Sequence, residues 1–250
     1  MKVTVIGGTG LVGRRVVGQL RRQGHEVVVA ARSTGIDIVT GTGLAKALEG
    51  TDVVVDVSNS GYGAPVAMEQ FFAAAGRLLL EAERKAGVAH HITMSAVGVG
   101  RLRSGYFLAK EAQEALVMEA GIAFTIVRSA PFFEFIYNIV DSGGDGDDVR
   151  LPPVEMQPIG ADDAASSLAR IAALGEASGI LEVVGPERHM LPDLALEILT
   201  ANEDQRRVLV DPDALYFGST CRNEPLTAHG RPPAGSTSFD DWLRAWIASA

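Results

Sequence analysis

The chain has 250 residues, of which 47% are hydrophobic, 21% charged and 6% aromatic, the composition of an ordinary globular protein. Its 22 basic and 31 acidic side chains give a formal net charge of −9, and no cluster of basic residues offers a surface for nucleic acid. The single Cys221 cannot form an intrachain disulfide, the first apolar run leaves no room for a signal peptide, and no stretch of about 18 apolar residues could cross a bilayer. We therefore expect a cytoplasmic protein without nucleic-acid or membrane partners. The sequence carries no signal for the oligomeric state.

The first 128 residues alternate between short apolar runs and longer segments with helical spacing. The runs predict buried strands at 3–6, 26–31, 51–57, 91–95 and 124–127, with a further short strand at 36–39. Helices are predicted from residue 11 to a stop at Gly24, and at 44–48, 69–86 and 107–120. Strands that alternate with helices of this length predict right-handed crossovers and a parallel, doubly wound α/β sheet of the Rossmann type.

After residue 128 the elements become shorter, because prolines and an acidic, glycine-rich stretch at 141–148 interrupt the pattern. Helices are predicted at 162–174, 194–201 and 239–248, a strand at 181–184 and a surface loop at 225–238. We predict a nucleotide-binding core at 1–130. Residues 131–250 would form a C-terminal part that covers the carboxyl edge of the sheet and shapes a substrate pocket, the whole being one compact unit.

Three glycines lie three residues apart between the first strand and the first helix. In this pattern Gly7 permits a tight turn, Gly10 lets the backbone approach a pyrophosphate, and Gly13 lets the helix pack against the strand. The free N–H groups and the positive dipole end of the helix would then hold the negative charge. The position of the motif favours dinucleotide binding over a simple turn.

The end of the second strand bears on the identity of the cofactor. An NAD site carries an acidic residue about 20 residues after the glycines, which holds the ribose 2′-hydroxyl. Here Arg32 and Ser33 stand instead, and both can bind a 2′-phosphate. We therefore predict NADP, while Asp37, a few residues further on, keeps NAD as the alternative.

Ser95, Tyr106 and Lys110 form a second group with chemical meaning. Tyr106 and Lys110 are four residues apart, so they share one face of a helix, and Ser95 ends the fifth strand at the edge where such sheets bind ligands. A lysine ammonium lowers the pKa of a neighbouring phenol, which can then donate a proton to a carbonyl while a serine hydroxyl orients that oxygen. The alternative is that Tyr106 packs and Lys110 binds a ribose without catalysis.

Several of these segments resemble the atypical short-chain dehydrogenase/reductases, and among them the NmrA-like NAD(P)H-binding branch. The resemblance rests on the glycine turn at 5–13, on 104–114 with its tyrosine and lysine, and on 124–128 followed by the aromatic run at 132–135. It covers about residues 1–200 and is specific in the first 135. It implies an extended Rossmann fold, NADP(H) as the usual ligand and a small C-terminal substrate region.

The resemblance also implies roles for individual residues. The pyrophosphate would lie along Gly7, Thr9, Gly10, Leu11 and Val12, and the 2′-phosphate against Arg32 and Ser33. The adenine and inner ribose would pass Val57, Ser58 and Asn59. The nicotinamide ribose would be surrounded by Ser95, Tyr106 and Lys110, and its ring flanked by Ala130, Pro131, Phe132 and Phe133.

These features predict an NADP(H)-dependent oxidoreductase that transfers hydride to a small carbonyl, quinone or activated alkene, with Tyr106 as proton donor. Two alternatives stay open: a dinucleotide-binding redox sensor that reduces nothing, and an isomerase or lyase on the same scaffold. Many regulator-like relatives lack the tyrosine, so its presence favours catalysis.

Three other features carry weaker functional signals. We expect no metal site, because adjacent residues such as His90 and His91 in a strand point to opposite faces. The acidic stretch at 141–148 has Pro152 where a calcium loop would place its closing glutamate. The aromatic residues Phe132, Phe133, Phe135 and Tyr137 could wall an apolar substrate pocket or belong to the core, and the sequence does not decide between the two.

Overall fold

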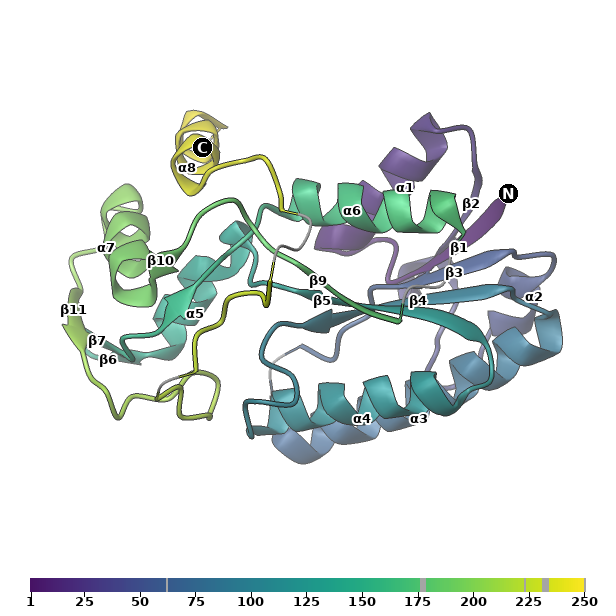
Figure 1. Ribbon diagram of the computed structural model, residues 1–250, viewed down its shortest axis with the longest axis horizontal. Coiled ribbons are helices and arrows are strands. Elements are labelled where there is room, and N and C mark those ends of the chain that lie inside the picture. The colour runs from purple at the N-terminus through teal and green to yellow at the C-terminus, as the bar shows by residue number, and fades with distance from the viewer. Residues whose placement is uncertain (62, 176–178, 223, 231–233, 250) are drawn as a thin grey trace.

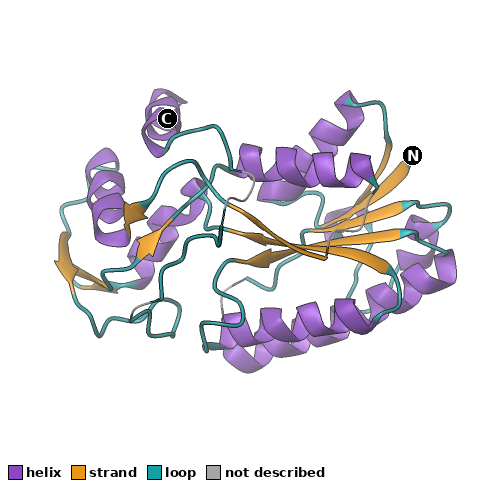
Figure 2. Ribbon diagram, viewed as in Figure 1, coloured by secondary structure: helices purple, strands orange, loops and turns teal. Residues whose placement is uncertain are grey.

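The computed structural model describes residues 1–61, 63–175, 179–222, 224–230 and 234–249 (Figures 1 and 2). A six-stranded sheet with helices on both faces forms its larger part. The strands of this sheet are β1 (Lys2–Ile6), β2 (Glu26–Ala30), β3 (Val53–Asp56), β4 (His90–Ala96), β5 (Ala123–Ser129) and β9 (Gly179–Val183). Their order is β2-β1-β3-β4-β5-β9 and every neighbouring pair is parallel. The predicted α/β fold with a Rossmann-type parallel sheet is confirmed.

The helices divide between the two faces of the sheet (Figure 1). One face carries α1 (Leu11–Arg22) and α6 (Ala161–Leu174), which pack against each other. The other face carries α2 (Leu44–Leu48), α3 (Pro65–Ala86) and α4 (Gly105–Glu119). The strands read as nearly continuous apolar runs because both of their faces are buried: Val5 faces the core under α1 and α6, while Ile6 faces the core under α2 and α3.

Two predictions for elements of the first half are corrected. Residues 36–39 form a turn and not a strand, because the Asp37 carboxylate accepts hydrogen bonds from the backbone N–H groups of Val39 and Thr40. The helix predicted from residue 69 begins at Pro65, whose missing N–H costs nothing in the first helical turn. The sixth strand of the sheet is therefore β9, which lies in the second half of the chain and pairs with β5.

Short elements build the remainder of the second half. They are η2 (Phe133–Phe135), α5 (Ile136–Ser142), β6 (Gly144–Asp145), β7 (Asp148–Leu151), β8 (Glu155–Met156), β10 (His189–Met190), α7 (Leu191–Ala201), β11 (Arg207–Val210) and α8 (Phe239–Ser249). The first half contains one further short element, η1 (Arg32–Thr34), directly after β2. Strands β6, β7 and β11 form a small separate sheet, beside which α5 and α7 pack. Of the predicted loop at 225–238, residues 231–233 lie outside the described residues.

These elements share a core that lies apart from the two cores of the central sheet. Phe133, Ile136 and Leu194 are buried in it, and Phe72 and Phe107 extend it from α3 and α4. The second half is thereby held against the carboxyl edge of the sheet. Among the described residues, no helix combines the length and the apolar character that a membrane span requires.

A candidate dinucleotide and catalytic site

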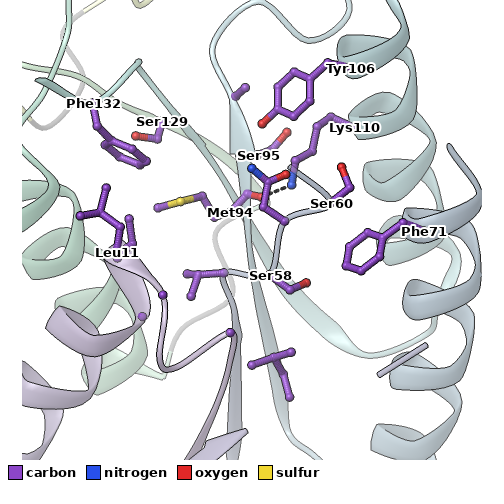
Figure 3. Close-up of a pocket in the computed structure, with 18 of the residues that line it drawn as sticks. Leu11, Ser58, Ser60, Phe71, Met94, Ser95, Tyr106, Lys110, Ser129 and Phe132 are labelled. Atoms are coloured by element: carbon purple, nitrogen blue, oxygen red, sulfur yellow. Dashed lines mark hydrogen bonds between the residues drawn. The ribbon is translucent and has the colours of Figure 1, made fainter. Parts of the chain in front are cut away.

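A pocket of about 920 Å³ opens along the carboxyl edge of the central sheet (Figure 3). Because parallel strands end at one edge, the loops that follow β1 to β5 all reach it. All but one of the predicted site residues line it: Gly7, Thr9, Gly10, Leu11, Val12, Gly13, Arg32, Ser33, Val57, Ser58, Asn59, Ser95, Tyr106, Lys110, Ala130, Pro131 and Phe132. Phe133 is the exception. The structure buries Phe133 in the core that the second half of the chain forms, where its ring packs edge-on against Phe239 and lies tilted to Trp242.

The glycine turn has the close backbone contacts that a dinucleotide site needs. Gly7 has φ +75°, which favours glycine, and a Cβ on Gly13 would collide with the Gly7 carbonyl oxygen. Gly10 stands before the first turn of α1, no side chain caps that turn, and it contains no acidic residue. The backbone N–H groups at this helix end are therefore available to an anion, so the residues present fit a pyrophosphate.

The end of β2 presents the polar residues predicted for the adenosine ribose. Arg32 is exposed and has no ion pair with any described residue, and the Ser33 hydroxyl lies 3.5 Å from that of Thr9 in the glycine turn. Asp37 also lines the pocket, but its Oδ1 accepts the Val39 N–H at 2.8 Å. One carboxylate oxygen is thus engaged in holding the turn.

The turn at 36–39 contributes a lining that the sequence analysis did not assign to the site. Ile36, Ile38 and Val39 line the pocket beside Arg32. They offer apolar contact to a flat base. Their position directly after Arg32 and Ser33, the residues predicted to hold a 2′-phosphate, was the available signal, and the prediction of a strand at 36–39 obscured it.

Lys110 reaches the pocket from α4 and is almost fully withdrawn from water, with 3% of its surface exposed. Its ammonium donates to the Met94 carbonyl oxygen at 3.0 Å (Figure 3). It also donates to Gln113 Oε1 at 2.9 Å and lies 4.2 Å from the centroid of the Phe72 ring. Burial lowers the pKa of Lys110 to about 8, against the opposing attraction of Asp56 and Glu114. The lysine is therefore held in one place, and its pKa of about 8 lies well below that of a solvated lysine.

A buried polar group behind the lysine fixes its position. The amide nitrogen of Gln113 donates to Asp56 Oδ2 and to the Thr93 hydroxyl, each at 3.3 Å, which leaves its oxygen facing Lys110. Asp56 ends β3 and its other oxygen accepts the Ser58 N–H at 2.9 Å. The same carboxylate thus supports both the lysine and a loop of the pocket wall.

The Ser95 hydroxyl donates to Glu114 Oε1 at 2.5 Å, and Glu114 in turn forms a two-point ion pair with Arg128, at 2.9 and 2.6 Å. A hydroxyl has one hydrogen to donate. In this arrangement Ser95 can accept a hydrogen bond from the pocket, and it can donate to a substrate oxygen after exchanging its bond to Glu114.

Tyr106 begins α4 and is 8% exposed, and its ring packs edge-on against Phe107 with centroids 5.5 Å apart. Figure 3 shows its hydroxyl directed into the pocket, above Ser95 and Lys110. The three residues that were predicted to act together are thus brought to one wall.

The aromatic residues after β5 have different environments. Phe132 and Phe135 line the pocket, whereas the Tyr137 hydroxyl donates to Asp204 at 3.1 Å. The pocket is completed by Tyr216 and Phe217, from the loop between β11 and α8. No local signal marks these two residues, because they come more than 80 positions after the last strand-end residue of the site.

The neighbouring histidines belong to the sheet and not to the pocket. The His90 ring contacts the Thr125 hydroxyl at 2.9 Å, while the His91 ring contacts Glu83 of α3 at 2.9 Å, on the opposite face. Within the described part of the chain, no group of three or more His, Cys, Asp or Glu side chains could hold a metal ion.

A family model described as NAD(P)H-binding matches residues 7–135, about half of the chain. This chain belongs to the NAD(P)H-binding family. The glycine turn, η1, Tyr106 and Lys110 all lie inside the matched region. The resemblance to an NAD(P)H-binding family, noted in the sequence, is thereby confirmed.

Two curated relatives are similar to about half of the chain. Photosystem II assembly factor Ycf39 of Synechocystis is 29% identical over 54% of this chain and 46% of its own length. The (4-alkanoyl-5-oxo-2,5-dihydrofuran-3-yl)methyl phosphate reductase of Streptomyces griseus is 30% identical over 52% of this chain and 48% of its own. The chain thus matches about half the length of each of these relatives.

The whole fold is similar to that of solved structures. A dTDP-4-dehydrorhamnose reductase of Clostridium acetobutylicum superposes with a TM-score of 0.74 at 15% identity, over 99% of this chain and all of the other. The likeness extends through the second half, which the family model does not reach.

Proposed function

We propose that this family member is an NADP(H)-dependent oxidoreductase that reduces a small carbonyl, quinone or activated alkene. The observation that carries the proposal is that Tyr106 and Lys110 line the same pocket as the glycine turn and Arg32. A group that can donate a proton therefore stands in the space that a bound dinucleotide would share with its substrate.

Bound NADPH would supply the hydride. Tyr106 would donate the proton that the substrate oxygen needs as the hydride arrives, and would regain one from solvent. The Lys110 ammonium beside it favours the ionised phenol and so eases the donation. Ser95 would orient the substrate oxygen, which requires its hydroxyl to exchange the bond to Glu114 described above.

The preference for NADP rests on charge at the end of β2. Arg32 is exposed and not paired with a described carboxylate, and Ser33 adds a hydroxyl. Asp37, the residue that would favour NAD, has one oxygen engaged by its own turn. A 2′-phosphate would thus meet an accessible guanidinium there.

Tyr106→Phe tests the catalytic role. We expect turnover with NADPH to fall by about 100-fold or more, the contribution typical of a general acid, because the ring remains and the proton is lost. The affinity for NADPH should stay within about twofold, since packing is retained. Turnover is measured as steady-state NADPH oxidation with a panel of carbonyls, quinones and activated alkenes. The affinity for NADPH is measured by fluorescence titration.

Full activity of the Tyr106→Phe variant would remove Tyr106 from the mechanism. If the wild-type protein binds NADPH tightly but oxidises none across the whole panel, a dinucleotide-binding sensor becomes the better function. The similarity to an assembly factor is the observation that keeps this second candidate in view.

Arg32→Ala tests the cofactor preference. Loss of a charged hydrogen bond to the 2′-phosphate should raise the Kd for NADPH by at least about tenfold and leave that for NADH nearly unchanged. Arg22→Ala is the control, because it removes the same charge from the exposed far end of α1. Equal losses for both cofactors would contradict the assignment, and titration calorimetry measures the affinities of the wild type and both variants for NADPH and NADH.

A further inference from the structure

The substrate end of the pocket is walled by aromatic rings from three segments that are distant in sequence. Tyr106 and Phe107 begin α4, Phe135 ends η2, and Tyr216 and Phe217 come from the loop before α8. Successive ring centroids along this wall lie 5.5, 6.3, 4.8 and 6.0 Å apart, from Tyr106 through Phe107, Tyr216 and Phe217 to Phe135. These are the separations of interacting aromatic pairs, so the rings form one continuous cluster that lines the pocket.

Within the described residues, this surface has no accessible charge of its own. Among the described residues that line the pocket, the charged ones are Arg32, Asp37 and Lys110. The first two follow β2, at the adenosine end, and Lys110 is buried with its ammonium on Met94 and Gln113. A phosphate or carboxylate on the substrate would lose its hydration here without gaining an accessible cation, which is unfavourable.

Phe217 is held in this wall at a cost in backbone energy. Its φ is +47°, a value rarely adopted by bulky residues, and Gly218 follows with φ +80°. The turn is closed by two reciprocal backbone hydrogen bonds between Tyr216 and Ser219, of 2.8 and 3.0 Å. Asparagine or glycine would fit the conformation with less strain. Such strain persists where a site requires the side chain, and here the ring stacks on Phe135 at an interplanar angle of 24°.

We propose that the aromatic wall is the binding site for a flat, uncharged ring that bears the reducible group, and that Phe217 is its specificity-determining residue. The reduction of the group on the ring rests on the proposed function, whereas the binding of the ring does not. The substrate class is thereby narrowed to quinones and to carbonyl compounds that carry a planar aromatic ring. Open-chain or anionic compounds are disfavoured. Stacking accounts for this choice, because the face of the ligand would lie against ring faces and edges of the wall.

Three ligands separate the effect of ligand shape from that of ligand charge. Their affinities are measured by calorimetry on the protein loaded with NADP⁺, so that no turnover occurs. Acetophenone is the flat uncharged probe, 2-octanone has the same number of carbons without a ring, and benzoylformate carries a carboxylate in place of the methyl group of acetophenone. We expect acetophenone to bind at least about tenfold more tightly than either of the others.

Phe217→Asn tests the residue itself. The variant should keep or raise the melting temperature, because asparagine tolerates positive φ, while its Kd for acetophenone should increase by about tenfold. Glu203→Asn is the matched control: Glu203 is the other described non-glycine residue with positive φ, at 55°, and it does not line the pocket. It should show the same relief of strain with no change in acetophenone binding.

Unchanged acetophenone affinity in Phe217→Asn, or tighter binding of 2-octanone or benzoylformate, would overturn the inference. It would equally be overturned if turnover occurred with open-chain carbonyls alone, a result that would leave the proposed reductase function intact. If acetophenone bound but no ring carbonyl or quinone caused NADPH to be oxidised, the conclusion would be the opposite: the ring site would stand and the reductase function would fall.

Discussion

At the scale of single residues, the chemistry of the pocket depends on how Lys110 is buried. Its ammonium is enclosed by a carbonyl oxygen, an amide oxygen and the face of Phe72, and Asp56 acts on it through Gln113. The enclosure costs free energy for the charged form, and for that reason the pKa of Lys110 falls to about 8. In the proposed function, this positive charge, which can be lost near pH 8, would hold a ribose and tune Tyr106.

This burial predicts a dependence of stability on pH. The folded protein releases the Lys110 proton near pH 8, whereas the unfolded chain keeps it until about pH 10.5, so between these values the unfolded state binds more protons. The free energy of unfolding should therefore rise with pH in this window, by about 2 kcal/mol between about pH 7.5 and 9.5.

The measurement is urea unfolding at both pH values, for the wild type and for Lys110→Met. The difference between the two proteins isolates this lysine, because other groups titrate alike in both. A difference that stays constant with pH would show that the pKa of Lys110 is not lowered.

At the scale of elements, the first helix illustrates how sequence and tertiary contact act together. Gly13 and Gly18 both lie in α1, but in different surroundings. A Cβ at Gly13 would collide with the backbone of the turn at Gly7, whereas at Gly18 the nearest atom is a flexible Arg22 side-chain nitrogen at 3.6 Å. The glycine of the motif is thus required by packing, and the other is a weak point of the helix.

We therefore expect opposite effects from the same substitution. Gly18→Ala should stabilise the protein by about 0.5–1 kcal/mol through better helix propensity, without changing the affinity for NADPH. Gly13→Ala should destabilise it and weaken NADPH binding, because the glycine turn must move away from α1. Thermal unfolding and NADPH titration of both variants provide the check, and retention of wild-type NADPH affinity in Gly13→Ala would contradict the role of the close approach.

At the scale of the whole molecule, the second half of the chain contributes to both the sheet and the pocket. After the short elements at 133–156, the chain returns to add α6 against α1 and β9 against β5 (Figure 1). The same half sends Phe135, Tyr216 and Phe217 to the pocket. The boundary predicted at residue 130 remains a prediction. Strand β9 and helix α6 nevertheless show that the central sheet draws on residues beyond it.

The sequence by itself determined the parallel sheet, the glycine turn and the predicted pocket-lining residues from Gly7 to Phe132. These follow from local periodicity and from the rule that parallel strands end at one edge. Only the tertiary structure decided that residues 36–39 form a pocket loop, that Phe133 is buried, and that the Ser95 hydroxyl meets Glu114. It alone also brought Phe217 to the site. The physical reason is that these outcomes depend on contacts between segments distant in the chain, which local spacing does not encode.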